Sequence, residues 1–442
     1  MLNLHCPWKQ ILSLTAILCV STSSYLSTSC SASQPPLAQA QAIAAPIHLP
    51  APEPTSHYTR SHPAPVSPFL RWQEMPQAVA WEIELSHNHS VFHTTKKIYI
   101  NGYNVKLPDN YPSDHFQWRV RALDIDAKPI SPYSAPQTVY ISHALHTPLS
   151  PEPTSVFNNG NGTVLLYPVY NWIPVNGVSK YEVEILNAPP ENPHGIAPSI
   201  HRIDTQEGHN FDCYDRKPRL STKPMYWRVR GLDEQGQPVG VYSPAREFTV
   251  NPAAEWQIAT YGDSISHGGG NISYSPSQFE YSYQSYLNFP VINLSESGDT
   301  SASLLERFER DVLPFHPAYL IIMGGTNSLR AATSATDVIA DLTELRDKCL
   351  AHNIKPIFLT LPPLNPANIY RAFQQTTAED WQEKFAEVND FIRTQTHIDI
   401  AADIPTEDGL LPTYYGRDGL HLDVPGKKLM AQAINRAWDK VN

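Results

Sequence analysis

The sequence predicts a multidomain protein in which two small all-β modules precede an α/β domain with a parallel sheet. The chain has 442 residues, more than one ordinary hydrophobic core accommodates. Two stretches of its first half repeat the same strand pattern. After Asn251-Pro252, apolar strands begin to alternate with helical segments. Such alternation is typical of a parallel sheet that helices cover on both faces.

The N-terminal segment has the layout of an export signal. Lys9 precedes an apolar run, residues 11–20, that is too short to span a bilayer comfortably and has the length of a signal-peptide core. We expect residues 1–32 to be a signal peptide and the Pro-rich residues 33–66 to be a linker. Cys30 ends Ser27-Thr-Ser-Cys30, which weakly resembles a bacterial lipoprotein processing site. The protein is therefore expected to be secreted or held in the cell envelope, with membrane contact only through a lipid on Cys30.

Charge and cysteine usage exclude several classes of partner. The net charge is -11, whereas a nucleic-acid or anionic-membrane partner would call for a basic face. None of the five cysteines lies in a CxxC or Cys/His pattern with zinc-ligand spacing, so no metal is expected.

The internal repeat defines the two β-modules. Trp81-Glu-Ile-Glu-Leu85 matches Tyr181-Glu-Val-Glu-Ile185, and Trp118-Arg-Val-Arg-Ala-Leu-Asp124 matches Trp227-Arg-Val-Arg-Gly-Leu-Asp233. Apolar and polar residues alternate in each block, which is the period of a strand with one buried face.

We place the modules at residues 67–142 and 155–251. Their early Trp and Trp-Arg-Val-Arg strand resemble fibronectin type III domains, which are small antiparallel sandwiches. We expect the tryptophans to lie in the cores rather than to form sugar-binding platforms, because each alternates with polar neighbours.

Residues 255–442 form the predicted α/β domain. The expected strands and helices alternate along it: strands 256–261, 291–294, 319–323, 355–361 and 397–400, and helices 280–287, 302–313, 334–352, 379–394 and 425–441. In such sheets, ligands bind at the carboxyl ends of the strands.

Ser264 follows the first of these strands, in Thr260-Tyr-Gly-Asp-Ser-Ile-Ser-His-Gly-Gly-Gly270. Residue statistics alone favour a helix cap or turn. A nucleophilic serine needs a base and a carboxylate that orients the base. Asp418 and His421 form the chain's single Asp-x-x-His, in a loop just before the last helix. On a turn, this spacing lets the carboxylate reach the nearer ring nitrogen.

Donors for an oxyanion also end strands of this domain. Asn293-Leu-Ser-Glu-Ser-Gly298 follows the second strand, and Gly324-Gly-Thr-Asn327 follows the third. A glycine lets its backbone N–H approach a reacting oxygen closely, and an asparagine side chain is a neutral donor.

The blocks GDSIS, NLSESG, GGTN and DGLH, in this order, are similar to those of the SGNH (GDSL-type) hydrolases over residues 255–442. The resemblance implies a flavodoxin-like fold, ester hydrolysis without a cofactor, Ser264 as nucleophile, His421 as base and Asp418 as its orienter. It also implies an oxyanion hole made by the backbone N–H groups of Ser264 and Gly298 and by the Asn327 side chain.

Two positions depart from the family pattern. Ser295 stands where glycine is frequent, and Ser328 where aspartate is frequent; both departures bear on pocket shape. We interpret Gly268–Gly270 as a mobile wall of the pocket and assign His267, Tyr414 and Tyr415 as candidate substrate-binding residues. For His267 a plain loop role, and for the two tyrosines packing, are the alternatives.

The expected function is that of an exported serine esterase, a carboxylic ester hydrolase acting on short-acyl, above all acetyl, esters of carbohydrate through an acyl-enzyme. One alternative is a lipase, thioesterase or acyltransferase using the same triad. The other is a non-catalytic carbohydrate-binding surface protein. Because no candidate catalytic residue precedes Tyr261, we expect residues 253–442 to hydrolyse small esters without the β-modules.

Overall fold

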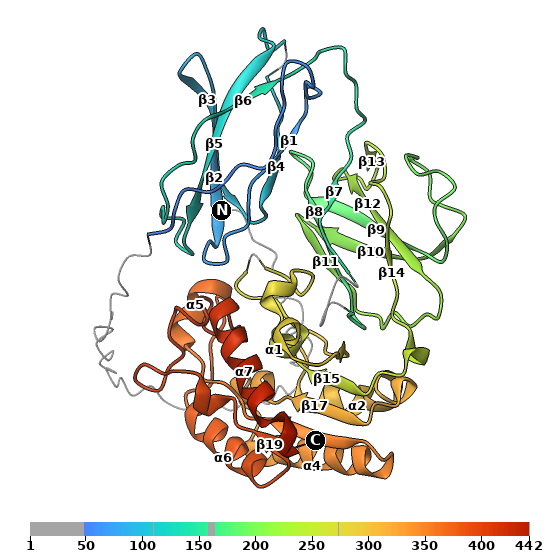
Figure 1. Ribbon diagram of the computed structural model, residues 1–442, viewed down its shortest axis with the longest axis vertical. Helices are drawn as coiled ribbons and strands as arrows, with labels where there is room; N and C mark the ends of the chain where they lie inside the picture. Colours follow the sequence, from blue (N-terminus) through green and yellow to red (C-terminus); the bar gives the residue numbers. More distant parts are fainter. Residues whose placement is uncertain (1–47, 109, 158–163, 273, 442) are drawn as a thin grey trace, which may run out of the picture.

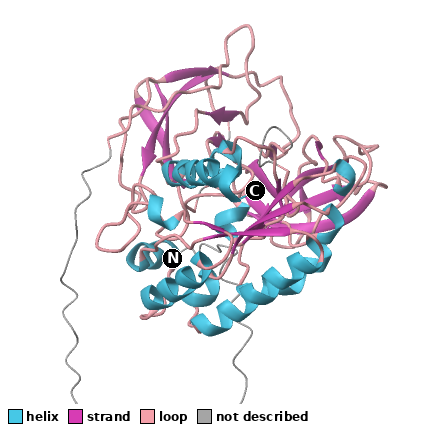
Figure 2. Ribbon diagram, turned by 60° about the horizontal axis from the view of Figure 1, so that its bottom comes forward, coloured by secondary structure: helices cyan, strands magenta, loops and turns pink. Residues whose placement is uncertain are grey.

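The computed structural model describes residues 48–108, 110–157, 164–272 and 274–441. It places two β-rich modules above a domain in which helices surround a sheet (Figures 1 and 2). The predicted signal peptide, Cys30 and the first part of the predicted linker lie outside the described residues. Within them, no helix has both the length and the apolar character that a membrane span requires.

The first module consists of antiparallel strands around a tryptophan core. Its four-stranded sheet has the order β3-β2-β5-β6, and a two-stranded sheet pairs β1 with β4. Trp72, Trp81 and Trp118 are buried, and the Trp72 ring lies 5.6 Å and 6.1 Å from the rings of the other two. The expected core role of these tryptophans is confirmed. The strands are β1 (Phe69–Arg71), β2 (Ala80–His87), β3 (Ser90–Ile98), β4 (Gly102–Asn104), β5 (His115–Leu123) and β6 (Gln137–Tyr140).

The second module is one antiparallel sheet of eight strands. Its order is β13-β12-β9-β10-β11-β8-β7, with β14 paired to β12. The strands are β7 (Glu152–Pro153), β8 (Val169–Ile173), β9 (Lys180–Leu186), β10 (Arg202–His209), β11 (Asp212–Tyr214), β12 (Met225–Leu232), β13 (Pro238–Val239) and β14 (Arg246–Phe248). Both modules are antiparallel as expected, and the fibronectin type III assignment stays a prediction.

Cross-strand ion pairs explain why the repeat keeps its charged residues. In the first module Glu84 lies opposite Arg119, whose Nε donates to the Glu84 carboxylate at 2.7 Å. In the second module Glu184 lies opposite Arg228, whose Nε donates to it at 2.5 Å. Directly opposed charges stabilise an antiparallel pair. The alternation therefore sends apolar side chains to the core and matched charges to the other face.

Residues 48–66 are not the free linker that their proline content predicts. Bridges pair Pro54 with Trp72, Tyr58 with Val139 and Ala64 with Ile141. The backbone N–H of Ala64 donates to the Tyr140 carbonyl at 2.8 Å. Proline is tolerated in an edge strand, because the missing N–H would face solvent there and no hydrogen bond of the sheet is lost. This segment is part of the first module.

The third domain contains the predicted parallel sheet, in the order β16-β15-β17-β18-β19. Helices α2, α4 and α6 pack one against the next, and α7 packs against β19 and against short 3₁₀ turns of the same domain. The strands are β15 (Ile258–Gly262), β16 (Ile292–Asn293), β17 (Tyr319–Met323), β18 (Lys355–Leu359) and β19 (His397–Ile398). The helices are α1 (Ser264–His267), α2 (Ser301–Asp311), α3 (Thr326–Arg330), α4 (Ala335–Ala351), α5 (Pro366–Phe373), α6 (Trp381–Arg393) and α7 (Val424–Val441).

One predicted helix of this domain is wrong, and helix α5 was not predicted. The helix expected at 280–287 is two 3₁₀ turns, η3 (Phe279–Tyr281) and η4 (Tyr283–Tyr286), because Ser282 between them is extended. Helix α5 was not expected, although its start carries a local signal. Asn365 caps the helix by accepting from the Asn368 N–H, and a proline occupies the first turn.

The second module and the α/β domain share one hydrophobic core. Leu165 forms a parallel bridge with Asn293, so the segment before β8 extends the sheet beyond β16. The Leu166 N–H donates to the Asn293 carbonyl at 2.9 Å, and the Tyr167 hydroxyl donates to buried Asp311 at 2.5 Å. Side chains on both sides, such as Trp227, belong to the same buried cluster. This continuity differs from the independent catalytic domain that the sequence predicts.

The first module also contacts the α/β domain. The hydroxyl groups of Tyr274 and Tyr281 donate to the carbonyls of Met75 and Pro76 at 2.9 Å and 2.8 Å. The two tyrosine rings stack with their centroids 4.1 Å apart. The turn before β2 thereby rests on a loop of the third domain.

We predict that a fragment of residues 253–442 is less stable than a fragment of residues 150–442. Removing the second module uncovers the edge of β16, exposes shared apolar core and leaves Asp311 without the Tyr167 hydroxyl. Thermal unfolding followed by circular dichroism should give a midpoint lower by roughly 5–10 °C for the shorter fragment. Equal midpoints would mean that the shared core contributes nothing to the stability of the α/β domain.

Candidate active site

The turn after β15 presents Ser264 at the start of α1. Asp263 caps this helix, because its Oδ1 accepts the Ile265 N–H at 3.0 Å. Gly262 is required just before it, since an added Cβ would lie 2.2 Å from the Met323 carbonyl oxygen on β17. The strand thus ends in a sharp turn that places Ser264 at the carboxyl edge of the sheet, where its side chain is almost fully buried.

The structure brings Ser264, His421 and Asp418 into one hydrogen-bonded chain. His421 Nε2 lies 2.9 Å from Ser264 Oγ, and His421 Nδ1 lies 2.8 Å from Asp418 Oδ2. A carboxylate only accepts, so Nδ1 carries the proton and Nε2 is free to accept from the serine hydroxyl. Asp418 Oδ1 accepts the N–H groups of Leu420 and His421 at 2.8 Å and 2.7 Å, which fixes the carboxylate. This arrangement can take a proton from a serine hydroxyl.

Helix α5 supports the loop that carries Asp418 and His421. The Asn365 N–H donates to the Gly419 carbonyl at 2.8 Å. Gly419 has φ +79°, and an added Cβ there would lie 2.3 Å from the Asn365 carbonyl oxygen, so only glycine suits this turn. Phe373, at the end of α5, meets the His421 ring edge-to-face at 6.0 Å.

The candidate oxyanion donors lie on adjoining segments. The Asn327 side-chain amide donates to the Asp299 carbonyl at 2.9 Å, which places it beside Gly298. The Glu296 N–H donates to the Gly262 carbonyl at 3.1 Å, so the same loop lies against the end of β15. Gly298 has φ 97°, a conformation that favours glycine. Their joint role as an oxyanion hole stays a prediction.

Arg330, which sequence reasoning did not single out, lies near this group. Its Nη1 is 3.4 Å from Asn327 Oδ1, and its Nη2 donates to Gln375 at 3.1 Å. An amide oxygen held by a cationic donor keeps the amide nitrogen turned the other way, toward Asp299. Arg330 is the last residue of α3, three positions after Asn327, and no spacing rule in the sequence would have found it.

His267 is not available as a substrate-binding residue, which corrects the prediction. It is buried, its Nε2 donates to the Tyr167 carbonyl at 2.8 Å, and its Nδ1 lies 2.8 Å from Ser297 Oγ. Burial lowers the pKa of His267 to about 3, so the ring is neutral. It holds α1 against the segment that extends the sheet. The glycines after it are buried as well, rather than forming an open wall.

Tyr414 and Tyr415 precede the loop of Asp418 and stack edge-to-face at 5.0 Å. The Tyr414 side chain is exposed, whereas Tyr415 packs against the core and its carbonyl accepts the Asp423 N–H at 2.7 Å. Tyr415 therefore has a structural role, and substrate contact by Tyr414 stays a prediction.

The two departures from the family pattern are buried. Ser328 Oγ accepts the Ser301 N–H at 2.9 Å and so helps to cap α2. The Ser295 N–H donates to Asn293 Oδ1 at 3.0 Å.

Buried ionisable groups lie near Ser264. Burial raises the pKa of Asp263 to about 7 and that of Asp423 to about 6, and it lowers the pKa of Lys427 to about 7. Sequence reasoning missed Lys427, although a signal existed. The lysine occupies the same helical stripe as Val424 and Met430, which are buried.

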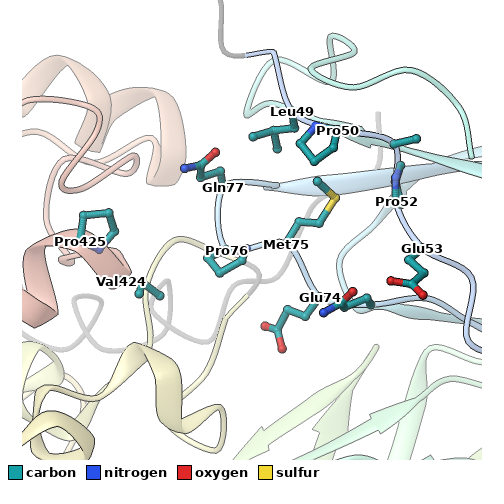
Figure 3. A pocket seen from close by; sticks show the side chains of 12 residues that line it. Leu49, Pro50, Pro52, Glu53, Glu74, Met75, Pro76, Gln77, Val424 and Pro425 are labelled. Carbon is teal, nitrogen blue, oxygen red and sulfur yellow. The ribbon is translucent and has the colours of Figure 1, made fainter.

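A pocket of about 590 Å³ opens between the first module and the start of α7 (Figure 3). Met75 and Pro76 line one side, and Val424 and Pro425 line the other. Burial raises the pKa of Glu74 at its margin to about 8, and Gln278 donates to Glu74 at 2.7 Å. None of the described lining residues is Ser264, Asp418 or His421. Throughout the described part of the chain, no three His, Cys, Asp or Glu side chains gather as a metal-binding group.

The geometry agrees with a comparison of the chain with known families. Residues 260–429 match the GDSL-like Lipase/Acylhydrolase family. This match confirms the resemblance over most of the C-terminal domain. The enzyme class that it supports is a carboxylic ester hydrolase of the SGNH/GDSL type.

Individual relatives are more distant. The chain is 28% identical over 123 residues to an uncharacterized lipoprotein, YqeF, of Bacillus subtilis (strain 168), covering 25% of this chain and 50% of the relative. The chain thus spans about half the length of the curated relative that it matches.

Among solved structures, the chain is similar to two bacterial proteins. One is a GDSL-like lipase from Bacteroides thetaiotaomicron, with 21% identity, coverage of 43% of this chain and 91% of that chain, and a TM-score of 0.34. The other is a lipase/acylhydrolase from Enterococcus faecalis, with 20% identity, coverage of 42% and 96%, and a TM-score of 0.33. At these identities and TM-scores, the similar structures give no evidence about which residues form the site.

We predict that His267 makes the protein less stable in mild acid. Its pKa lies below the ordinary 6.5, so the unfolded chain binds the proton more readily, and stability falls as the pH drops from 6.5 toward 3. Between pH 6.5 and pH 5 this amounts to about 2 kcal/mol. Urea unfolding at these pH values should show a smaller loss for His267→Gln than for the wild type. His352→Gln, at an exposed histidine, is the matched control and should behave like the wild type.

Proposed function

We propose that this protein is a serine ester hydrolase of the cell envelope that removes short acyl groups, acetyl above all, from carbohydrate. The observation that carries the hydrolase assignment is the chain from Ser264 Oγ through His421 to Asp418, with contacts of 2.9 Å and 2.8 Å. A serine hydroxyl that is hydrogen-bonded to an oriented imidazole is an activated nucleophile.

In the proposed reaction, Ser264 Oγ attacks the ester carbonyl carbon while His421 Nε2 takes the hydroxyl proton. Asp418 holds the Nδ1–H and stabilises the imidazolium that forms. The carbonyl oxygen becomes negatively charged, and the N–H groups of Ser264 and Gly298 with the Asn327 amide stabilise it.

The intermediate collapses when the bond to the alcohol oxygen breaks, and His421 gives its proton to that oxygen. The alcohol leaves and an acyl-enzyme on Ser264 remains. Water then attacks the acyl carbon, and His421 takes a proton from it. The acid is released as Ser264 regains its hydrogen, so the cycle consumes one water and needs no other reactant.

Three features support the proposed substrate and location. The sequence begins with an export signal layout, and a relative of the chain bears the name lipoprotein. Two β-modules precede the hydrolase domain, an arrangement that suits work on an extracellular polymer. The polar and aromatic side chains after the strands, Tyr414 among them, suit sugar hydroxyls and rings better than a long acyl chain.

We predict that Ser264→Ala or His421→Ala lowers kcat on p-nitrophenyl acetate by at least about 10³-fold, while the double variant loses little more than either single one. The three groups act as one unit, so the first substitution already removes the catalytic contribution of the triad and the second removes little more. Steady-state kinetics checks this, and an unchanged circular dichroism spectrum is the control for folding. A Ser264→Ala protein with near wild-type activity would falsify the assignment of the nucleophile.

Covalent labelling is a second measurement on the same variants. A fluorophosphonate probe should label the wild type and not Ser264→Ala, since only an activated serine reacts. An unlabelled, inactive wild type would favour the non-catalytic carbohydrate-binding protein.

We predict that kcat/KM falls steeply from acetyl to octanoyl nitrophenyl esters. A site built for acetyl groups on a sugar has no apolar surface to bind the longer chain. Release of acetate from acetylated polysaccharide, identified by chromatography, tests the carbohydrate side directly. A profile that rises with chain length would instead promote the lipase and thioesterase alternative.

A further inference from the structure

Lys427 is a buried lysine that the proposed reaction does not use. It lies in the first turn of α7 and is completely inaccessible to solvent. Its Nζ donates to the carbonyl of Ile265 at 2.6 Å. Ile265 follows Ser264 directly, and α7 begins three residues after His421. Lys427 therefore joins the turn that carries the nucleophile to the segment that carries the base.

The hydrogen bond from Lys427 to Ile265 connects the same two segments as the hydrogen bond between Ser264 and His421. The bond between Ser264 Oγ and His421 Nε2 must break and re-form during each turnover, so it cannot alone fix the two segments. The Ile265 peptide is held at both ends, because its N–H donates to Asp263 Oδ1 and its carbonyl accepts from Lys427. A displacement of about 1 Å between reacting groups is enough to lower a rate by about 10²-fold.

In its protonated form, Lys427 also supplies positive charge to a buried acidic environment. Asp263, Asp418 and Asp423 act on it electrostatically, and all three are completely buried. Two arginines are also nearby: the Arg417 Nη1 lies 3.4 Å from Asp423, and Arg330 interacts electrostatically with Asp418 and Asp263. When the reaction converts His421 to imidazolium, a further positive charge appears in this group. A charge on Lys427 therefore affects how easily this buried group accommodates the imidazolium that the reaction forms.

A purely structural role would not favour a lysine at this position. Burying an ammonium group costs free energy unless it is compensated, and apolar substitutes of similar size at such positions are often neutral or stabilising. The neighbouring buried positions of the same stripe, Val424 and Met430, are apolar. The charged group is thus explained better by the active site beside it than by packing.

We infer that Lys427 is a positioning residue of the ester hydrolysis, which ties the nucleophile turn to α7 and balances the buried carboxylates around His421. The inference rests on the proposed hydrolase function. It concerns a residue outside the four blocks that carry the family resemblance.

The test compares Lys427→Met, Lys427→Gln and the matched control Lys428→Met, whose lysine is exposed on the same helix. The substrate is p-nitrophenyl acetate, measured from pH 5 to pH 9. Lys427→Met should lower kcat by roughly 10–100-fold with KM within about twofold of the wild type, because it removes only the alignment of the reacting groups. The Tm should be unchanged or higher, and Lys428→Met should match the wild type.

The pH profile separates the two proposed effects of Lys427, its hydrogen bond to the Ile265 carbonyl and its positive charge. Loss of a cation from this buried group favours protonation of the groups that remain, so the acidic limb of kcat/KM should move to higher pH in both Lys427 variants. Gln retains a donor for the Ile265 carbonyl, so Lys427→Gln should keep more of kcat than Lys427→Met. If Lys427→Met does not fold, the position of the acidic limb of kcat/KM in Lys427→Gln tests the inference.

The outcomes remain distinct from the test of the hydrolase itself. An active wild type with unchanged kcat and pH profile in both Lys427 variants overturns the role of Lys427 alone. A wild type that neither hydrolyses esters nor reacts with a fluorophosphonate overturns the proposed function. A lower kcat that is accompanied by a lower Tm, with no shift of the acidic limb, assigns Lys427 to folding and also overturns the inference.

Discussion

A single contact of 2.9 Å between Ser264 Oγ and His421 Nε2 joins parts of the chain that are 157 residues apart. It exists because the parallel sheet sends the carboxyl ends of its strands to one edge, so the turn after β15 and the loop before α7 meet there. The rest of the domain holds these two segments in register. Gly262 allows the close approach to β17, and α5 packs behind the loop of His421. An error of about 1 Å in this register would leave the serine without its base.

Charge is concentrated in the interior next to this contact. Water would normally solvate such groups, but Asp263, Asp418, Asp423 and Lys427 are completely buried. Their mutual interactions and hydrogen bonds replace part of that solvation. The neutral His267 works differently, because it is held by uncharged partners and joins α1 to the second module. The second module is therefore connected to the region of Ser264 as well as placed before it.

Much of the architecture follows from local patterns in the sequence. Alternation with a period of two predicted the antiparallel modules, and the matched Glu and Arg positions became opposed ion pairs. Strand β17 (Tyr319–Met323) has the predicted bounds. The failures arise where local and tertiary preferences differ. Residues 48–66 look like a linker, but their backbone pairs with the first module. The apolar residues at 280–287 fit a helix in the sequence. In the structure this segment instead forms two 3₁₀ turns.

The sequence by itself was enough to predict the parallel sheet and to single out Ser264, Asp418 and His421, because these predictions depend on periodicity, spacing or a short block. Only the tertiary structure decided which other side chains share their environment. Burial assigned His267 to the interior and brought Lys427 beside the nucleophile turn, and shared packing joined the second module to the hydrolase domain. The physical reason is that burial and hydrogen-bond partners depend on contacts between distant segments, and neither leaves a pattern in any one stretch of the chain.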